Sequence, residues 1–173
     1  MAKIAIVNEH DEVIGASEMA EARQLGQIHR ITRILIFDAQ GRLLLQKRSA
    51  KMKDSPNKWD FSVAGHVDEG EDYQQAALRE AREEIGLELA GLKPLAKFYT
   101  DKVKDGDRVR RFNTVFIATT NQELHPDSNE VAEVRWFSRS ELDGMVERSP
   151  QDFTTTFVAK YSELSRLTAG IFY

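Results

Sequence analysis

Three glutamates stand close together in the chain, at Glu80, Glu83 and Glu84. Their i, i+3, i+4 spacing would place all three carboxylates on one face of a helix. Like charges at that distance repel one another, and the helix is weakened unless a positive group lies among them. Mg²⁺ and Mn²⁺ prefer carboxylate oxygens, and Mg²⁺ commonly links carboxylates to substrate phosphates. The spacing therefore indicates a metal site, with a solvated acidic face paired to Arg79 and Arg82 as the ordinary alternative.

A longer pattern surrounds the glutamates and covers residues 65–87. The stretch resembles the Nudix box of MutT-type hydrolases, G-x5-E-x7-R-E-U-x-E-E-x-G-U, where U is a bulky aliphatic residue. The fixed letters at the required spacing are Gly65, Glu71, Arg79, Glu80, Glu83, Glu84 and Gly86. Chance rarely places so many letters in register at ordinary residue frequencies, so the resemblance is specific even though Ala81 is small for its position.

The residues around the glutamates predict a strand, a turn and a helix. Residues 60–64 read as a strand, and Gly65 would permit a backbone turn at its end. Asp72 is the expected N-cap because the apolar spacing starts just after it, and Gly86 is the expected C-cap. The predicted packing stripe consists of Ala77, Leu78, Ala81 and Ile85. A carboxylate at Glu71 suits the positive helix end, and the resemblance implies that it pairs with Arg79.

Composition places the chain among ordinary globular proteins and suits one domain over residues 1–173. Hydrophobic residues make up 41% and charged residues 30%, and the net charge of −4 argues against stable binding of nucleic acid or a membrane. The absence of cysteine excludes disulfides, zinc thiolate sites and thiol catalysis. No apolar run approaches membrane-spanning length and no signal-peptide pattern is visible, so we expect a cytoplasmic protein.

The remaining pattern predicts an α/β (α+β) fold, with a mixed β-sheet sandwiched between helices. Residues 1–26 read as an N-terminal hairpin extension, with strands over 3–7 and 12–16 and a short helix over 18–25 capped by Ser17. Further strands are predicted over 28–37, 43–46, 89–99, 108–119 and 131–137, with an exposed hairpin tip over 100–107, and helices over 139–146 and 153–167. The apolar spacing of the last helix predicts core packing.

A basic loop precedes the acidic box and begins with Lys47 and Arg48. Opposite charges on two sides of a cleft would suit a magnesium-bound pyrophosphate, so both residues are candidates for substrate binding. An ordinary solvated loop is the alternative. His66, inside the box, is a further candidate for contact with substrate.

The chain also resembles type 1 isopentenyl-diphosphate isomerase, which has a Nudix fold and no hydrolase activity. The shared features include His29, Arg48, the run 62–66 and the Trp136 strand. That enzyme needs a cysteine where this chain has Ala64, and a glutamate on a strand that we align to Asn113. Neither replacement can exchange protons with carbon, so the resemblance supports the fold and not the reaction. The isomerase counterparts of His29 and His66 bind metal, but here both are expected to be structural or to face substrate.

The box implies a pyrophosphohydrolase that cleaves a phosphoanhydride in a nucleoside diphosphate linked to another group. The expected ligands of Mg²⁺ or Mn²⁺ are Glu80 and Glu84, then Glu83, with the carbonyl of Ala64 implied by resemblance. The general base stays open among Glu80, Glu130 and Glu133, and the loop over 122–130 could bring Glu130 to the site. A nucleotide-sensing module without turnover is a further alternative. The substrate is open, and homodimers, common in this family, are a candidate assembly.

Overall fold

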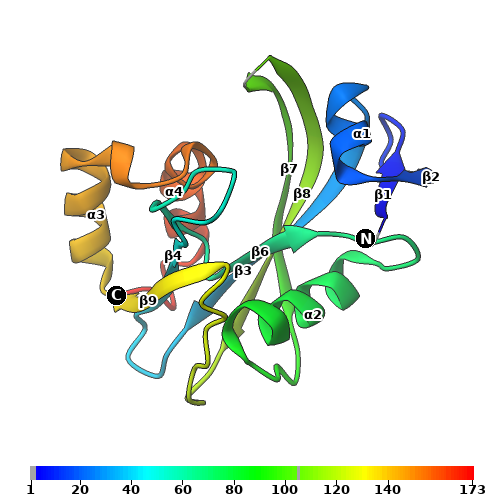
Figure 1. The fold of residues 1–173 in the computed structure, drawn as a ribbon. Helices are drawn as coiled ribbons and strands as arrows, with labels where there is room; N and C mark the ends of the chain where they lie inside the picture. Colours follow the sequence, from blue (N-terminus) through cyan, green and yellow to red (C-terminus); the bar gives the residue numbers. More distant parts are fainter. Residues whose placement is uncertain (1–2, 105) are drawn as a thin grey trace.

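The computed structural model describes residues 3–104 and 106–173, which form a nine-stranded mixed sheet with helices on both faces (Figure 1). The strands are β1 Ile4–Val7, β2 Val13–Ser17, β3 Ile28–Phe37, β4 Leu43–Arg48, β5 Trp59–Asp60, β6 Val63–His66, β7 Lys93–Lys104, β8 Asp107–Thr119 and β9 Val131–Phe137. The α-helices are α1 Met19–Gln24, α2 Tyr73–Ile85, α3 Arg139–Arg148 and α4 Thr155–Leu167, and a 3-10 turn covers Pro150–Asp152. The predicted fold class is confirmed.

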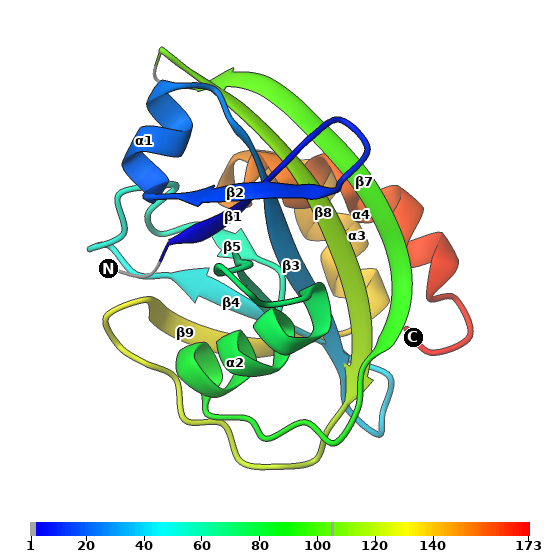
Figure 2. The same ribbon diagram turned by 90° about the vertical axis from the view of Figure 1, so that its right-hand side faces the viewer.

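The central strand β3 is buried along almost its whole length because its apolar side chains serve both faces of the sheet. Ile34 and Ile36 pack toward α2 in one core cluster, together with Val63 and Ala81. Leu35 and Phe37 point the other way and join a second cluster with residues of α3 and α4. Figure 2 shows α2 on the near side of the sheet and α3 and α4 behind it.

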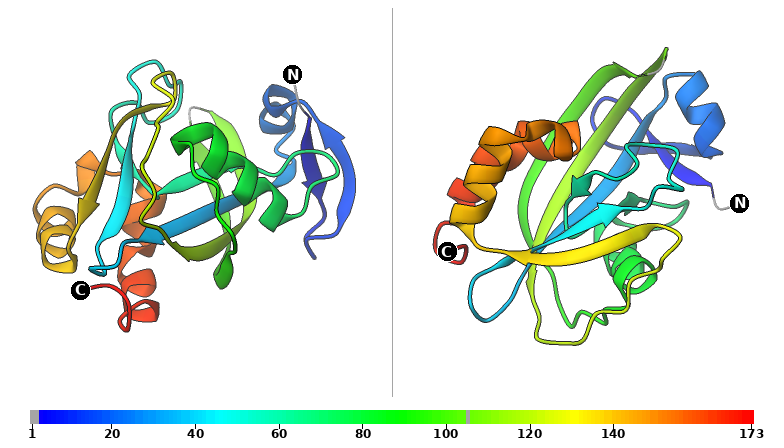
Figure 3. Two further views of the ribbon diagram at one scale, coloured as in Figure 1. Left: turned by 90° about the horizontal axis from the view of Figure 1, so that it is seen from below. Right: turned by 60° about the vertical axis from the view of Figure 1, so that its left-hand side comes forward.

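The sheet divides into two parts at one end of β3. Along its length β3 pairs in parallel with β8, and it pairs antiparallel with β6, but with β4 it pairs only where Phe37 meets Leu43. Strand β4 then pairs with β5 and β9. Strands β4 and β9 therefore diverge from β3, β7 and β8, as Figure 3 shows in its right-hand view.

The predicted strand over residues 60–64 is wrong, because the chain passes from one part of the sheet to the other at Ser62. The Ser62 hydroxyl accepts a hydrogen bond from the Ile36 N–H and donates one to the Leu44 carbonyl, so it occupies the gap between β3 and β4. Strand β5 before it pairs with β4, and β6 after it pairs with β3. Gly65 consequently lies inside β6 and makes no turn at a strand end.

Helix α2 begins and ends where the sequence predicts. The Asp72 side chain accepts a hydrogen bond from the Gln75 N–H, and the Gln75 side chain accepts one from the Asp72 N–H, which completes a capping box. Gly86 ends the helix with φ of +68°, a conformation that favours glycine. Leu78 is only half-buried, whereas Ala76 and Glu84 are buried with the predicted stripe.

Other predicted boundaries shift for identifiable reasons. Strands β7 and β8 continue through the predicted hairpin tip, where Arg108 pairs with Asp101 across the two strands. Strand β7 begins only at Lys93, so the predicted start at residue 89 is wrong. Glu18 is the N-cap residue of α1 and makes no side-chain capping bond, while Ser17 ends β2. Thr154 caps α4, whose buried face joins the core as predicted.

Strand β9 has the bounds that the sequence predicts, Val131–Phe137. Within residues 3–104 and 106–173, no helix combines the length and the apolar character needed to cross a membrane.

The N-terminal hairpin is attached to the rest of the molecule through Asp11, in the turn between β1 and β2. Its carboxylate accepts hydrogen bonds from Arg30 Nε at 2.7 Å and from the Tyr73 hydroxyl at 3.0 Å, and it also pairs with Lys97. Burial opposes ionisation, but hydrogen bonds from Lys97, Arg30 and Tyr73 outweigh it and lower the pKa of Asp11. One carboxylate thus joins the hairpin to β3, α2 and β7.

We expect Asp11→Asn to lower the free energy of unfolding by about 1–3 kcal/mol at pH 7, because a hub of charge-assisted hydrogen bonds is weakened. Asparagine tolerates the positive φ of 60° at this position, so the backbone should not be strained. The lowered pKa means that the stabilisation is present above the ordinary aspartate pKa and disappears as the pH falls through the folded value. Urea unfolding from pH 7 to pH 3 tests this, with exposed Asp107→Asn as control. Equal loss in both variants would contradict it.

Candidate active site

The carboxylate of Glu84 is buried at the place where the two parts of the sheet separate. Its Oε2 atom accepts hydrogen bonds from Gln46 Nε2 at 2.8 Å and from the Ala64 N–H at 3.1 Å. Gln46 belongs to β4 and Ala64 to β6, so Glu84 bridges the two parts. Burial raises the pKa of Glu84 well above its ordinary value, and the charges of Glu80 and Glu130 add to the effect. A buried acid of this kind is a candidate functional group.

Glu80 lies one helical turn earlier and packs directly against β6. A Cβ atom on Gly65 would come within 2.0 Å of Glu80 Cδ, so the glycine is needed for this close approach. Burial raises the pKa of Glu80 to about 7, against the opposing effect of Arg79 and with a further rise from Glu83 and Glu130. Gly65 therefore matters for its missing side chain, and not for the predicted turn.

The guanidinium of Arg79 is the positive group among the acids. It donates to both oxygens of Glu71 at 2.8 and 2.9 Å, to Glu80 at 2.8 Å and to Glu83 at 3.1 Å. It also donates to the His66 carbonyl at 2.9 Å. The pairing of Glu71 with Arg79 is confirmed. Arg79 therefore supplies part of the positive charge among these carboxylates, as the alternative of an acidic face paired to arginine expects.

The three glutamates do not converge on one point in this structure. The Glu83 side chain is 57% exposed and turns toward Arg79, while Glu84 turns into the sheet. Within the described ranges, no three acidic or histidine side chains are arranged as a ready metal cluster. Glu130 is exposed and its charge acts on Glu80 and Glu84, whereas Glu133 is exposed on β9 at the register position of Lys47.

The donor set nonetheless fits a hard divalent cation. Burial raises the pKa of both Glu80 and Glu84. The charge of Glu130 adds to the rise at both, and the charge of Glu80 adds to the rise at Glu84. A divalent cation beside these carboxyl groups would favour their ionised form. Glu83 and Glu130 are exposed carboxylates whose charges also act on Glu80.

The prediction that Lys47 and Arg48 begin a loop is wrong, because both are the last residues of β4, and their side chains have different surroundings. Arg48 Nε donates to the Asp54 carbonyl at 2.9 Å, and Arg48 lines a cavity of about 120 Å³. Lys47 lies outside that lining and places its Nζ 5.8 Å from the centre of the Trp59 ring. The cavity brings Arg48 together with His66 and Ala64, as predicted candidates, but not with Lys47.

The two histidines are stacked, and His29 is buried while His66 is half-buried and lines this cavity. Their ring centroids are 5.4 Å apart, and His66 Nε2 has no hydrogen-bond partner in the described part of the chain. Burial keeps the pKa of His66 well below its ordinary value and lowers that of His29 to about 4, so both rings are neutral near pH 7. His66 faces the cavity, as a substrate-facing residue would.

Sequence reasoning missed three polar residues at the centre of the fold, Gln46, Arg33 and Arg111. Gln46 holds Glu84, and the two arginines line the cavity. A signal existed for Arg33, because it interrupts an otherwise apolar strand. Asn113 lies behind Arg33 and accepts a hydrogen bond from its Nε at 3.1 Å, outside the cavity lining.

Comparison with known proteins agrees with this geometry. The family model described as the NUDIX domain matches residues 27–157. The chain belongs to the Nudix family. An uncharacterized Nudix hydrolase of Pseudomonas aeruginosa is 37% identical over 139 residues, which cover 80% of this chain and 79% of that protein.

Other similar Nudix proteins differ in the activity that they are named for. An isopentenyl-diphosphate Delta-isomerase 2 of Photorhabdus laumondii is 31% identical over 155 residues, covering 89% of this chain and 87% of that one. A protein of Deinococcus radiodurans with a crystal structure superposes with a TM-score of 0.71 at 27% identity, over 85% of this chain and 90% of that one. The family is therefore shown, while relatives include both hydrolases and isomerases by name.

We expect Glu80→Gln to stabilise the metal-free protein at alkaline pH. Because the folded pKa of about 7 exceeds the ordinary 4.5, stability present below pH 4.5 is lost as the pH rises through 7. Glutamine stays neutral and avoids this loss, so the melting temperature should rise by about 2–8 °C at pH 8 and little at pH 4.5. Thermal unfolding in chelator tests this, with exposed Glu123→Gln as control. A variant no more stable than the parent at pH 8 would contradict the assignment.

Proposed function

We propose that this protein is a metal-dependent Nudix hydrolase that cleaves a phosphoanhydride bond, with residues 1–173 acting as one domain. The observation that carries the proposal is the pair of acids beside β6, the half-buried Glu80 and the buried Glu84, both with raised pKa values. Their burial is costly to the protein, and the box geometry places them at the opening between the two parts of the sheet. A function that uses their charge accounts for keeping them there.

Each residue has a distinct part in the proposed site. Glu80 and Glu84 would hold Mg²⁺ or Mn²⁺, with Glu83 and the Ala64 carbonyl as additional ligands. The bound cation would neutralise phosphate charge and lower the pKa of water. Glu130, exposed and electrostatically linked to both acids, is our preferred general base, with Glu133 and Glu80 as alternatives.

Basic and neutral groups near β6 would orient the substrate. Arg48 and Ala64 line the cavity together with His66, whose buried Nε2 has no hydrogen-bond partner among the described residues. Lys47 lies over Trp59, so in this proposal it acts at the rim of the site. The substrate is a nucleoside diphosphate linked to another group, and the proposed assembly, as in many relatives, is a homodimer in the cytoplasm.

The isomerase is the alternative that the named relatives raise. Its chemistry needs an acid and a base that exchange protons with carbon. Ala64 occupies the position of its cysteine, and the carboxylates that line the cavity, Asp54 and Asp60, are already paired with cations. A nucleotide-sensing module remains the second alternative, and the complete set of box glutamates favours turnover over sensing.

The first test is a substrate panel, with products identified by mass. We expect hydrolysis of at least one diphosphate-linked compound with Mg²⁺ or Mn²⁺ at about millimolar concentration, and none in excess chelator, because the carboxylates need the cation to act on phosphate. Isopentenyl diphosphate should not be isomerised. Full turnover in chelator, or robust isomerisation, would contradict the proposal.

The second test compares two glutamates of the box. In Glu84→Gln one amide oxygen can still accept both hydrogen bonds that now converge on Oε2, so we expect metal-free stability to hold or rise while the rate falls at least about 100-fold. In Glu71→Gln the paired hydrogen bonds from Arg79 are weakened, so both stability and rate should fall. Thermal unfolding in chelator and rates in Mg²⁺ measure the contrast. Near-normal turnover of Glu84→Gln would show that these acids are not the metal site.

A further inference from the structure

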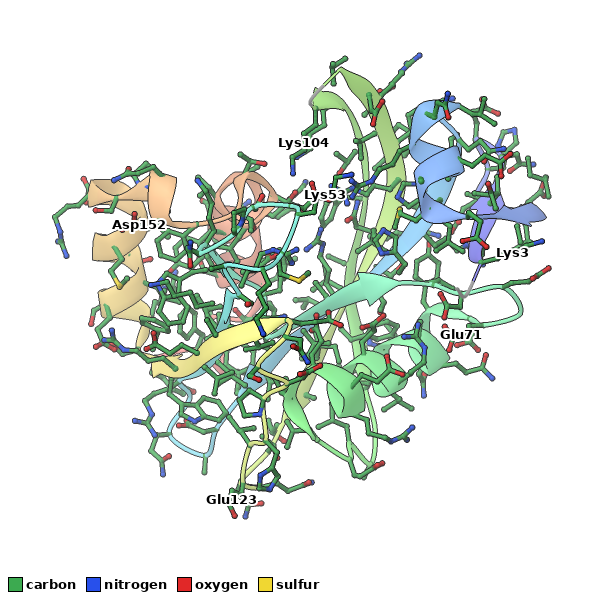
Figure 4. The ribbon with its side chains drawn as sticks, viewed as in Figure 1. Lys3, Lys53, Glu71, Lys104, Glu123 and Asp152 are labelled. Carbon is green, nitrogen blue, oxygen red and sulfur yellow. The ribbon has the colours of Figure 1, made fainter. Side chains whose placement is uncertain are left out.

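The cavity beside β6 lies on the face of the sheet opposite α2. Its β3 residues, Ile31 and Arg33, alternate with Ile34, which packs toward the helix. The other walls come from α1, β7, β8, the loop before β5 and the start of α4. Figure 4 shows Lys104 extending from the β7–β8 hairpin toward the loop that carries Lys53. The volume of about 120 Å³ is well below the roughly 300–1,000 Å³ of pockets for drug-sized ligands, so the cavity suits a compact group.

Positive charge dominates the lining. Six cationic side chains line the cavity: Arg23, Arg33, Arg48, Lys102, Lys104 and Arg111. Only two carboxylates accompany them in the lining. Asp54 pairs with Arg23 and Lys104, and Asp60 lies 3.7–3.8 Å from Arg48 and Arg33. The lining therefore carries four more positive than negative side chains.

Among these cations, Arg111 has the least satisfied hydrogen-bonding group. Its Nε atom is buried and has no hydrogen-bond partner among the described residues. Burial, with the nearby charges of Arg33 and Arg23, lowers its pKa to about 10, so it is still charged at neutral pH. A buried guanidinium nitrogen without a hydrogen bond is costly, and an anion bound beside this half-buried side chain would offset that cost.

The uncharged part of the lining also suits an anion. Thr154, Thr155 and Thr156 come from the beginning of α4, where the positive end of the helix dipole and the hydroxyl groups favour negative charge. Lys102 Nζ already donates to the Thr155 hydroxyl at 3.0 Å. No phenylalanine, tyrosine or tryptophan is among the lining residues that the structure describes, and the ring of His66 is already stacked on His29, so the lining is poorly suited to a nucleobase.

The cavity and the acidic site meet at Gly65, which lines the cavity and also contacts Glu80. We propose that the cavity binds a phosphate group distinct from the diphosphate that is cleaved beside Glu80 and Glu84. The substrate is then a diphosphate in which the linked group carries a compact phosphomonoester. This assignment of substrate class rests on the proposed hydrolase function, whereas the phosphate site itself does not.

Binding of inorganic phosphate tests the site without metal or turnover. Calorimetry on the full chain at pH 7.5 in chelator should detect phosphate binding that Arg111→Gln weakens by about tenfold or more, the loss expected for one charge-assisted hydrogen bond. Lys102→Gln, at a less buried position, should weaken it as well. Arg110→Gln is the matched control, because Arg110 is the neighbour on β8 but donates to the Tyr99 hydroxyl outside the cavity. No binding by the parent, or equal affinity in the parent, Arg111→Gln and Lys102→Gln, would overturn the site.

Kinetics with Mg²⁺ test the substrate class separately. For two diphosphate esters that differ only in a phosphomonoester or a hydroxyl on the linked group, the parent should have a kcat/KM at least about tenfold higher for the phosphorylated one. Arg111→Gln should lose that preference mainly through KM, and Arg110→Gln should keep it. Glu84→Gln should bind phosphate normally in chelator while hydrolysing neither ester. Phosphate binding without hydrolysis of any substrate would reject the hydrolase function alone, whereas hydrolysis without the preference would reject the substrate class.

Discussion

The guanidinium of Arg79 is the contact on which the acidic site depends. It joins Glu71 in the loop, Glu80 and Glu83 on the helix, and the carbonyl of His66 on β6. Three elements are held at fixed separation by one planar group with several donors in a rigid fork. Without this partner the carboxylates would repel one another and the loop would have no anchor on the helix. The hydrogen bonds to Glu71 favour the charged form of Arg79 and so raise its pKa above the ordinary value.

The division of the sheet gives the molecule two chemically different sides at β6. On the α2 side, Glu84 bridges β4 and β6, and Glu80 packs against Gly65, where a side chain would clash with it. On the α4 side, most of the charged residues that line the cavity are cations. A single short strand thus separates carboxylates suited to a cation from arginines suited to an anion. Opposite charges so arranged can orient a phosphorylated substrate across the strand.

The relatives illustrate why fold alone does not settle chemistry in this family. Proteins named as isomerases and as a Nudix hydrolase align with most of this chain at comparable identity. The distinction rests on particular side chains, because proton exchange with carbon and water attack on phosphorus need different groups. Here the complete glutamate set favours attack on phosphorus, and Ala64 removes the thiol that the other reaction requires.

Local sequence determined the elements that depend on neighbours along the chain. The ends of α2 follow from Asp72 and Gly86, and β3 and β9 have the predicted bounds because neither segment contains glycine, proline, asparagine or aspartate. The Glu71–Arg79 pair was also predictable, through the spacing of the box. These features are local because capping, turn residues and helical spacing act over a few residues.

Only the tertiary structure decided where charges meet. The position of Ser62 between β3 and β4 broke a predicted strand, and the approach of Glu80 explained Gly65, although neither partner is close in sequence. The gathering of Arg33 and Arg111 in one cavity follows from the parallel pairing of β3 with β8, which places Arg33 opposite Val115 and Arg111 opposite His29. The spacing of residues along the chain does not predict which strands pair, whereas burial and electrostatic interaction depend on distance in space.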